Sequence, residues 1–137
     1  MKKKILIIVA DYYKDIASNL LNSAKLYLKN KSSLSINLIR VPGVFEIPVT
    51  ISKNIKKYDA FISLGCVIKG ETPHFDFISN STTNAIMDLS ITSKKPIGNG
   101  IITSLNLQQA IQRSGVGKKK GKGKEATKAV ISVLSQK

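Results

Sequence analysis

The segment from Gly65 to Asp76, which reads GCVIKGETPHFD, holds the residues best suited to chemistry. His74 is the single histidine of the chain, and imidazole has an ordinary pKa that allows proton transfer near neutral pH. Thr72 and Pro73 are typical of a helix start, with Thr72 as N-cap and Pro73 as first helical residue. A helix N-terminus attracts anions, so the segment predicts a phosphate or carboxylate site beside an acid–base histidine. The alternative is that His74 is only a capping or surface residue.

A second candidate segment is Val41–Pro48, VPGVFEIP. Its Pro-Gly pair predicts a turn, after which Glu46 opens a helix. Glu46 either complements the helix dipole or accepts hydrogen bonds from hydroxyl groups of a ligand. Tyr12 is either a solvent-exposed aromatic residue or a stacking platform for a planar ring. The residues alone leave both pairs of alternatives open.

Short apolar runs alternate with amphipathic stretches along the chain, which is typical of a parallel sheet covered by helices. Four strands are predicted, at Lys4–Ala10, Leu34–Val41, Ala60–Ile68 and Ile97–Thr103. The first and third are almost continuously apolar, as in central strands, whereas the second alternates with polar residues like an edge strand. Open parallel sheets bind ligands beyond the carboxyl ends of their strands, where Tyr12, Glu46 and His74 all fall.

Helices are predicted between the strands. Apolar residues recur at helical spacing over 16–28 and over 126–134, which indicates two helices that face the core. A shorter helix follows Glu46. The middle helix, from about Pro73 to Thr92, has a thin apolar stripe, so we expect part of it to face solvent or another subunit.

Two further features lie near the end of the chain. Asn106 and Gln109 resemble a helix-capping pair. The Gly/Lys run from Gly115 to Lys124 has low complexity and is a candidate mobile loop.

Length and cysteine content limit the class of protein. A chain of 137 residues fits a single domain, residues 1–137. The apolar runs are too short to span a bilayer, and no signal-peptide pattern is present, so we expect no membrane partner. Cys66, the single cysteine, has no disulfide partner and no partner for a metal site. This is typical of a cytoplasmic protein.

The formal net charge of +14 raises the question of nucleic-acid binding. Arg40 and Arg113 are the only arginines, so the planar forks that read base edges are nearly absent. The lysines are spread along the chain, apart from a cluster over 118–124. We therefore expect a solvated surface that attracts anionic substrates and no nucleic-acid partner.

Four segments together resemble the lumazine synthase family: Val41–Pro48, Gly65–Ile78, Gly100–Gly115 and the loop Gly121–Ala126. The resemblance implies an α/β fold, a three-layer flavodoxin-like sandwich whose central four-stranded parallel sheet carries helices on both faces. It implies a transferase of riboflavin biosynthesis that condenses 5-amino-6-ribitylaminouracil with dihydroxybutanone phosphate to 6,7-dimethyl-8-ribityllumazine, releasing phosphate and water. It also implies that neither a metal nor a cofactor is required.

The resemblance also assigns roles by position. Residues matched to the ribitylaminouracil site are Tyr12, Val44, Phe45, Glu46, Cys66, Val67, Ile68 and Asn99. Residues matched to the butanone phosphate site are Glu71, Thr72 and Arg113, with Lys122 and Glu125 as further contact candidates. Tyr12 matches an aromatic residue that stacks on the pyrimidine ring, Cys66 to Ile68 match backbone contacts, and His74 matches the proton donor.

The family pattern further implies pentamers in which Asn99 and Arg113 reach the site of a neighbouring subunit. In some members the pentamers assemble into hollow icosahedral shells. The sequence departs from the pattern at Lys69, Glu71, Asn99 and Leu105, and its lysine loop is one residue longer. The alternative function is a non-catalytic flavodoxin-like module that binds a phosphate or nucleotide.

Overall fold

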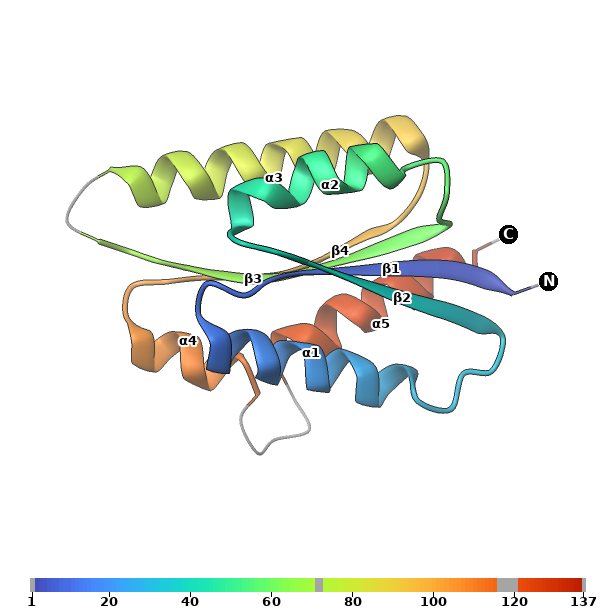
Figure 1. Ribbon diagram of the computed structural model, residues 1–137, viewed down its shortest axis with the longest axis horizontal. Coiled ribbons are helices and arrows are strands. Elements are labelled where there is room, and N and C mark those ends of the chain that lie inside the picture. Colours follow the sequence, from blue (N-terminus) through green and yellow to red (C-terminus); the bar gives the residue numbers. More distant parts are fainter. Residues whose placement is uncertain (1, 71–72, 116–120, 137) are drawn as a thin grey trace.

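Four parallel strands form one sheet in the computed structural model, which describes residues 2–70, 73–115 and 121–136 (Figure 1). The strands are β1 (Lys3–Ala10), β2 (Leu34–Val41), β3 (Ala60–Ile68) and β4 (Ile97–Ser104). Their order across the sheet is β2-β1-β3-β4, and every neighbouring pair is parallel. All four predicted strands are confirmed, to within one residue at each end.

The central strands are those with continuous apolar sequence. β1 and β3 are buried along most of their length, whereas β2 is partly exposed and forms one edge, as its alternating sequence predicts. Successive β1 side chains point to opposite faces. Ile5, Ile7 and Val9 enter one core, while Leu6 and Ile8 enter the other.

Helices cover both faces of the sheet, which gives the predicted three-layer arrangement (Figure 1). One face carries α1 (Lys14–Leu28), α4 (Leu107–Arg113) and α5 (Lys122–Leu134). The other carries the 3-10 turn η1 (Val44–Glu46), α2 (Ile47–Asn54) and α3 (His74–Ser93). Each layer of helices encloses its own hydrophobic core against the sheet.

The start of α5 differs from the prediction for the Gly/Lys run. Residues 116–120 lie outside the described part, but Lys122 to Lys124 belong to a helix, not to a loop. Gly123 explains this, because a Cβ there would lie 2.3 Å from the Leu20 carbonyl oxygen of α1. A residue without a side chain lets α5 begin in direct contact with the backbone of α1.

Other local expectations are confirmed or corrected. Asn106 caps α4, since its Oδ1 accepts a hydrogen bond from the Gln109 N–H at 2.9 Å. Pro73 is the N-cap of α3 and not its first helical residue, because its carbonyl already accepts the Phe77 N–H. The predicted N-cap, Thr72, lies outside the described residues. The apolar face of α5 is only partly buried, since Val133 is exposed beside the edge strand β4.

None of the helices in the described part of the chain is both long enough and apolar enough to cross a membrane.

Candidate active site

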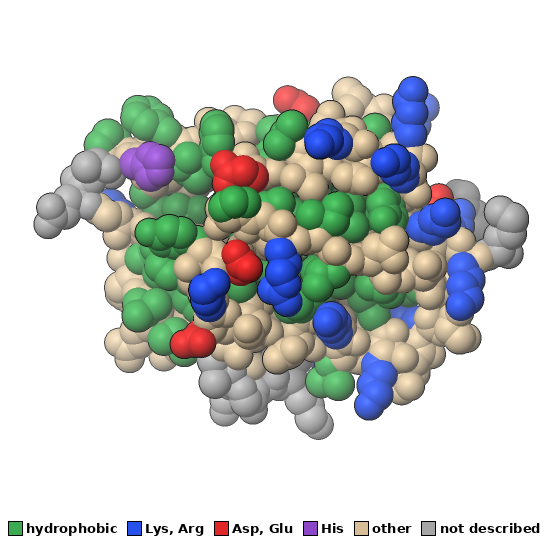
Figure 2. Space-filling model, viewed as in Figure 1, with side chains coloured by type: hydrophobic (Ala, Val, Ile, Leu, Met, Phe, Trp, Pro, Cys, Tyr) green, Lys and Arg blue, Asp and Glu red, His purple; other side chains and the backbone are tan. Residues whose placement is uncertain are grey.

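A pocket of about 340 Å³ lies beyond the carboxyl ends of β1 and β3. Four stretches of chain meet there: the turn into α1, the η1 turn, the end of β3 and the start of α3. Its lining residues are Tyr12, Tyr13, Gly43, Val44, Phe45, Cys66, Val67, Ile68, His74 and Ile78. Most residues predicted for the ribitylaminouracil site thus surround one cavity together with the predicted proton donor. Figure 2 shows the histidine at one end of the molecule among hydrophobic side chains.

The turn after β1 supplies two aromatic rings to this pocket. Tyr12 is 75% exposed and meets Tyr13 edge to face, with ring centroids 5.0 Å apart. Tyr13 is half-buried, and burial, with a smaller effect of Cys66, raises the pKa of its phenol. The sequence interpretation missed Tyr13, although two adjacent aromatic residues at a strand end indicate that one can pack while the other faces solvent.

The end of β3 offers backbone groups that the sheet does not use. The last β1–β3 pair is Val9 with Leu64, so β3 extends beyond its neighbour. The Phe61 and Lys69 N–H groups donate toward the β4 side. Because peptide groups alternate along a strand, the N–H and C=O of Ile68 point to the opposite side, where β1 has ended and the pocket lies. These groups can bind the polar edge of a planar ring.

Cys66 is buried in the pocket wall, with 7% of its surface exposed. Burial raises the pKa of its thiol to about 11, so the sulfur is neutral at physiological pH. A neutral, buried thiol is a poor nucleophile. The side chain of Cys66 therefore shapes the cavity and takes no part in covalent chemistry.

His74 is the first residue of α3 and lies at the pocket wall. Phe77 and Asp76 both donate their N–H groups to the Pro73 carbonyl, so the helical bonding begins after His74 and Phe75. The N–H groups of the first turn of a 20-residue helix therefore face this end of the pocket. Glu71 and Thr72, matched to the phosphate, lie outside the described residues.

Glu46 sits at the margin of the pocket. It precedes α2 and lines an adjacent cavity between α2 and α3 together with Ser81 and Thr82. A Cβ at Gly43 would lie only 3.1 Å from Glu46 Oε1, so the carboxylate lies against Gly43, which lines the main pocket. Glycine at position 43 keeps the carboxylate close to the main cavity.

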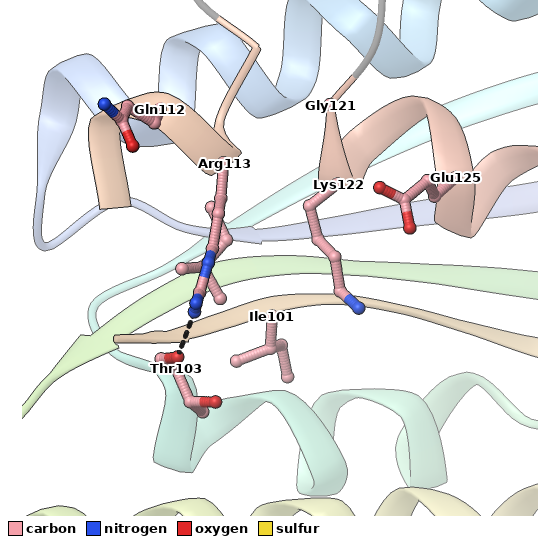
Figure 3. A pocket seen from close by; sticks show the side chains of 8 residues that line it. Ile101, Thr103, Gln112, Arg113, Gly121, Lys122 and Glu125 are labelled. Atoms are coloured by element: carbon pink, nitrogen blue, oxygen red, sulfur yellow. Dashed lines mark hydrogen bonds between the residues drawn. The ribbon is translucent and has the colours of Figure 1, made fainter. Parts of the chain in front are cut away.

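The remaining predicted residues lie at the β4 edge and not beside His74. Arg113, Lys122 and Glu125 line a separate pocket of about 450 Å³ over β4 (Figure 3). Arg113 Nη1 donates a hydrogen bond to the Thr103 carbonyl at 2.9 Å. Asn99 lies on the same strand, where its Oδ1 accepts the Ile101 N–H at 3.1 Å and its side chain faces a further cavity. One chain thus holds two separate groups of the predicted residues.

Within residues 2–70, 73–115 and 121–136, no group of three or more His, Cys, Asp or Glu side chains is arranged to hold a metal ion.

The parallel sheet, with its pocket beyond the carboxyl strand ends, defines a flavodoxin-like α/β protein with a cavity where such folds bind their ligands. The family model described as 6,7-dimethyl-8-ribityllumazine synthase matches residues 2–137, and the chain belongs to this family of enzymes.

Similar curated proteins carry the same name. A relative from Agrobacterium fabrum is 39% identical over 99% of this chain and 95% of its own length. One from Ruthia magnifica is 39% identical over 97% of this chain and 84% of its own length. One from Bartonella bacilliformis is also 39% identical, over 97% of this chain and 89% of its own length. The family name places this chain among the transferases of riboflavin biosynthesis.

Proposed function

We propose that the pocket between Tyr12, Ile68 and His74 is where this enzyme condenses 5-amino-6-ribitylaminouracil with 3,4-dihydroxy-2-butanone 4-phosphate. The observation that carries this assignment is the convergence of aromatic rings, unused strand backbone and an imidazole at one helix N-terminus. The relatives are named as enzymes, which favours catalysis over the alternative of a binding module.

The lining residues suit the parts of the first substrate. A uracil ring can stack on the tyrosine pair, while its polar edge meets the backbone of Ile68. The ribityl chain carries hydroxyl groups that can donate to the Glu46 carboxylate at the pocket margin. Val44 and Phe45 supply apolar contact between these two regions.

The start of α3 suits the phosphate of the second substrate. The N–H groups of its first turn and its positive dipole end stabilise an anion, and the matched Thr72 precedes it in sequence. The reaction needs only proton transfers and anion stabilisation. The amine attacks the ketone and water leaves to form an imine; phosphate is then eliminated, and ring closure expels a second water. His74 carries protons among these steps, while the helix start holds the departing phosphate.

The second group of residues leads us to infer a shared site. Arg113 and Lys122 are cationic side chains beside a pocket at the exposed β4 edge, away from His74 of the same chain. A neighbouring subunit could bring this edge against the His74 pocket, so that its Arg113 completes the phosphate site. We propose a cyclic homo-oligomer, a pentamer, with one active site at each subunit interface.

We place the enzyme in the cytoplasm, in keeping with its single buried thiol.

A direct assay tests the reaction. Purified protein is mixed with both substrates, and the absorbance and fluorescence of lumazine are followed together with released phosphate. We expect both products in equal amounts. A protein that binds either substrate without forming lumazine would be the binding module instead.

A further inference from the structure

Lysines that are scattered along the sequence gather at one end of the folded molecule. Because all four strands run in the same direction, the start of β1 and the loops that enter the other strands share one edge of the sheet. The lysines at this amino end are Lys2, Lys3, Lys4, Lys25, Lys29, Lys31, Lys53, Lys56, Lys57, Lys94 and Lys95. In Figure 2 most basic side chains lie toward the end where both termini lie in Figure 1. The candidate active site is at the opposite end.

The positive charge at the amino end is not neutralised by neighbouring carboxylates. In loops 29–33, 55–59 and 94–96, Asp59 is the only acidic residue, and its Oδ2 accepts the Lys4 backbone N–H at 2.8 Å. None of these lysines forms a salt bridge with a carboxylate of the described residues. Charges of one sign at this density create a strong local potential that attracts anions.

The same end contains a groove suited to an extended ligand. A hollow of about 540 Å³ lies between the end of α1 and the exposed edge of β2. Its rim carries four lysines, at positions 2, 25, 29 and 31, and Lys31 Nζ lies 4.7 Å from the centre of the Tyr27 ring. Backbone hydrogen bonds from Lys3 to Ser33 and from Asp59 to Lys4 join the neighbouring segments, so the charged surface is firmly held.

The chemistry of this surface favours a phosphate chain over other anionic partners. Lysine binds phosphate as a point charge without reading base edges. The three loops expose no large hydrophobic side chain, and Ile36, 36% exposed, is the single exposed large hydrophobic residue among those that line the groove, which is too little for a membrane anchor. From the sequence we expected no nucleic-acid partner, but the fold gathers its scattered lysines at one end. We propose that this amino-end surface binds single-stranded nucleic acid through its phosphates, independently of sequence, with the groove between α1 and β2 holding part of the strand.

Fluorescence anisotropy with a labelled single-stranded RNA of about 20 nucleotides tests this proposal. KCl is varied from about 50 to about 200 mM, and the logarithm of the association constant should fall linearly with the logarithm of salt, by about 0.7 for each phosphate contacted. The double variant Lys25→Gln/Lys29→Gln should lose about fivefold or more in affinity near 100 mM salt and show a shallower slope. Lumazine formation by the wild type should continue in saturating RNA.

A matched pair controls for net charge. Lys14→Gln/Lys128→Gln removes the same charge outside the amino end and should keep affinity within about twofold of wild type. Lys57→Gln/Lys94→Gln removes two charges from other loops of the amino end and should lower the affinity in the same way. The test therefore does not depend on the folding of a single variant. Absence of wild-type binding near 50 mM salt, equal losses in all three pairs, or preferential binding to anionic phospholipid vesicles would each overturn the proposal.

Discussion

At the scale of single residues, the environment of each side chain limits the chemistry it can perform. His74 lies at a helix start on the wall of the pocket, whereas Cys66 is buried in a strand with a raised pKa. The buried thiol keeps its proton at physiological pH and is a poor nucleophile. In the proposed site, an imidazole and backbone groups therefore act on the substrates, and the thiol contributes shape.

We expect His74→Ala to lower kcat by about 10²-fold, at the low end of the range for an acid–base group, and to leave some activity. Residual turnover is expected because binding and orientation of the substrates persist. Steady-state lumazine formation measures the effect. Asn84→Ala, at an exposed position of the same helix and outside the pocket, should retain wild-type turnover. Equal rates for His74→Ala and wild type would exclude His74 from the chemistry.

Cys66 makes the stability of the protein depend on alkaline pH. Its thiol has a pKa of about 11 in the folded state against an ordinary 9.0, so the folded state holds its proton more tightly than the unfolded state. Stability from this group is fully present below pH 9.0 and falls as pH rises toward 11. Urea unfolding at several pH values should show a steeper loss for wild type than for Cys66→Ser. Parallel curves for the two proteins would contradict this assignment.

At the scale of elements, close contacts between backbones fix how the helices lie on the sheet. α5 crosses α1 with Gly123 against the Leu20 carbonyl, and this contact sets where α5 begins. The start of α5 also carries Lys122 and Glu125, so the same contact positions part of the β4 pocket.

Gly123→Ala should lower the free energy of unfolding by about 1 to 3 kcal/mol, because the new methyl group meets a backbone carbonyl that cannot move aside. Gly70→Ala is the matched control, since no atom lies within 4 Å of its added Cβ. Urea denaturation measures both changes. A neutral Gly123→Ala would mean that α5 can shift away from α1 without cost.

The sequence predicts these elements well where periodicity and burial agree. Continuous apolar runs identified β1 and β3 as central, and the alternation in β2 identified an edge. Sequence reasoning failed where the environment of a residue depends on contacts with distant parts of the chain. The role of Gly123 depends on a contact with Leu20 far away in the chain, and the burial of Tyr13 rather than Tyr12 depends on how the turn into α1 packs.

At the scale of the whole molecule, one chain carries the His74 pocket and the Arg113 pocket at separate places. The first could be assembled from sequence, because strand ends of a parallel sheet meet at one edge. The position of the Arg113 pocket, at the β4 edge, became known only from the folded structure. A complete site then requires two subunits in the proposed assembly.

Mixing two impaired variants tests a shared site. His74→Ala and Arg113→Ala subunits are dissociated together, reassembled in equal amounts and assayed for lumazine. If neighbours share each site, roughly a quarter of the interfaces would hold both native residues, and activity should recover to that extent. Light scattering before and after mixing reports the oligomer size. No recovery in an assembled mixture would place both residues in the site of one subunit.

The parallel direction of the four strands has an evolutionary consequence. Segments that leave strands and segments that enter them alternate along the chain, yet they lie at opposite ends of the molecule. Codons for the candidate active site and codons for the lysine-rich amino end are thus interleaved in the gene. The two surfaces that they encode lie far apart. Selection can change one end without disturbing the other, and chimeras that exchange only strand-entering loops between homologues should inherit a new surface charge with the original catalyst.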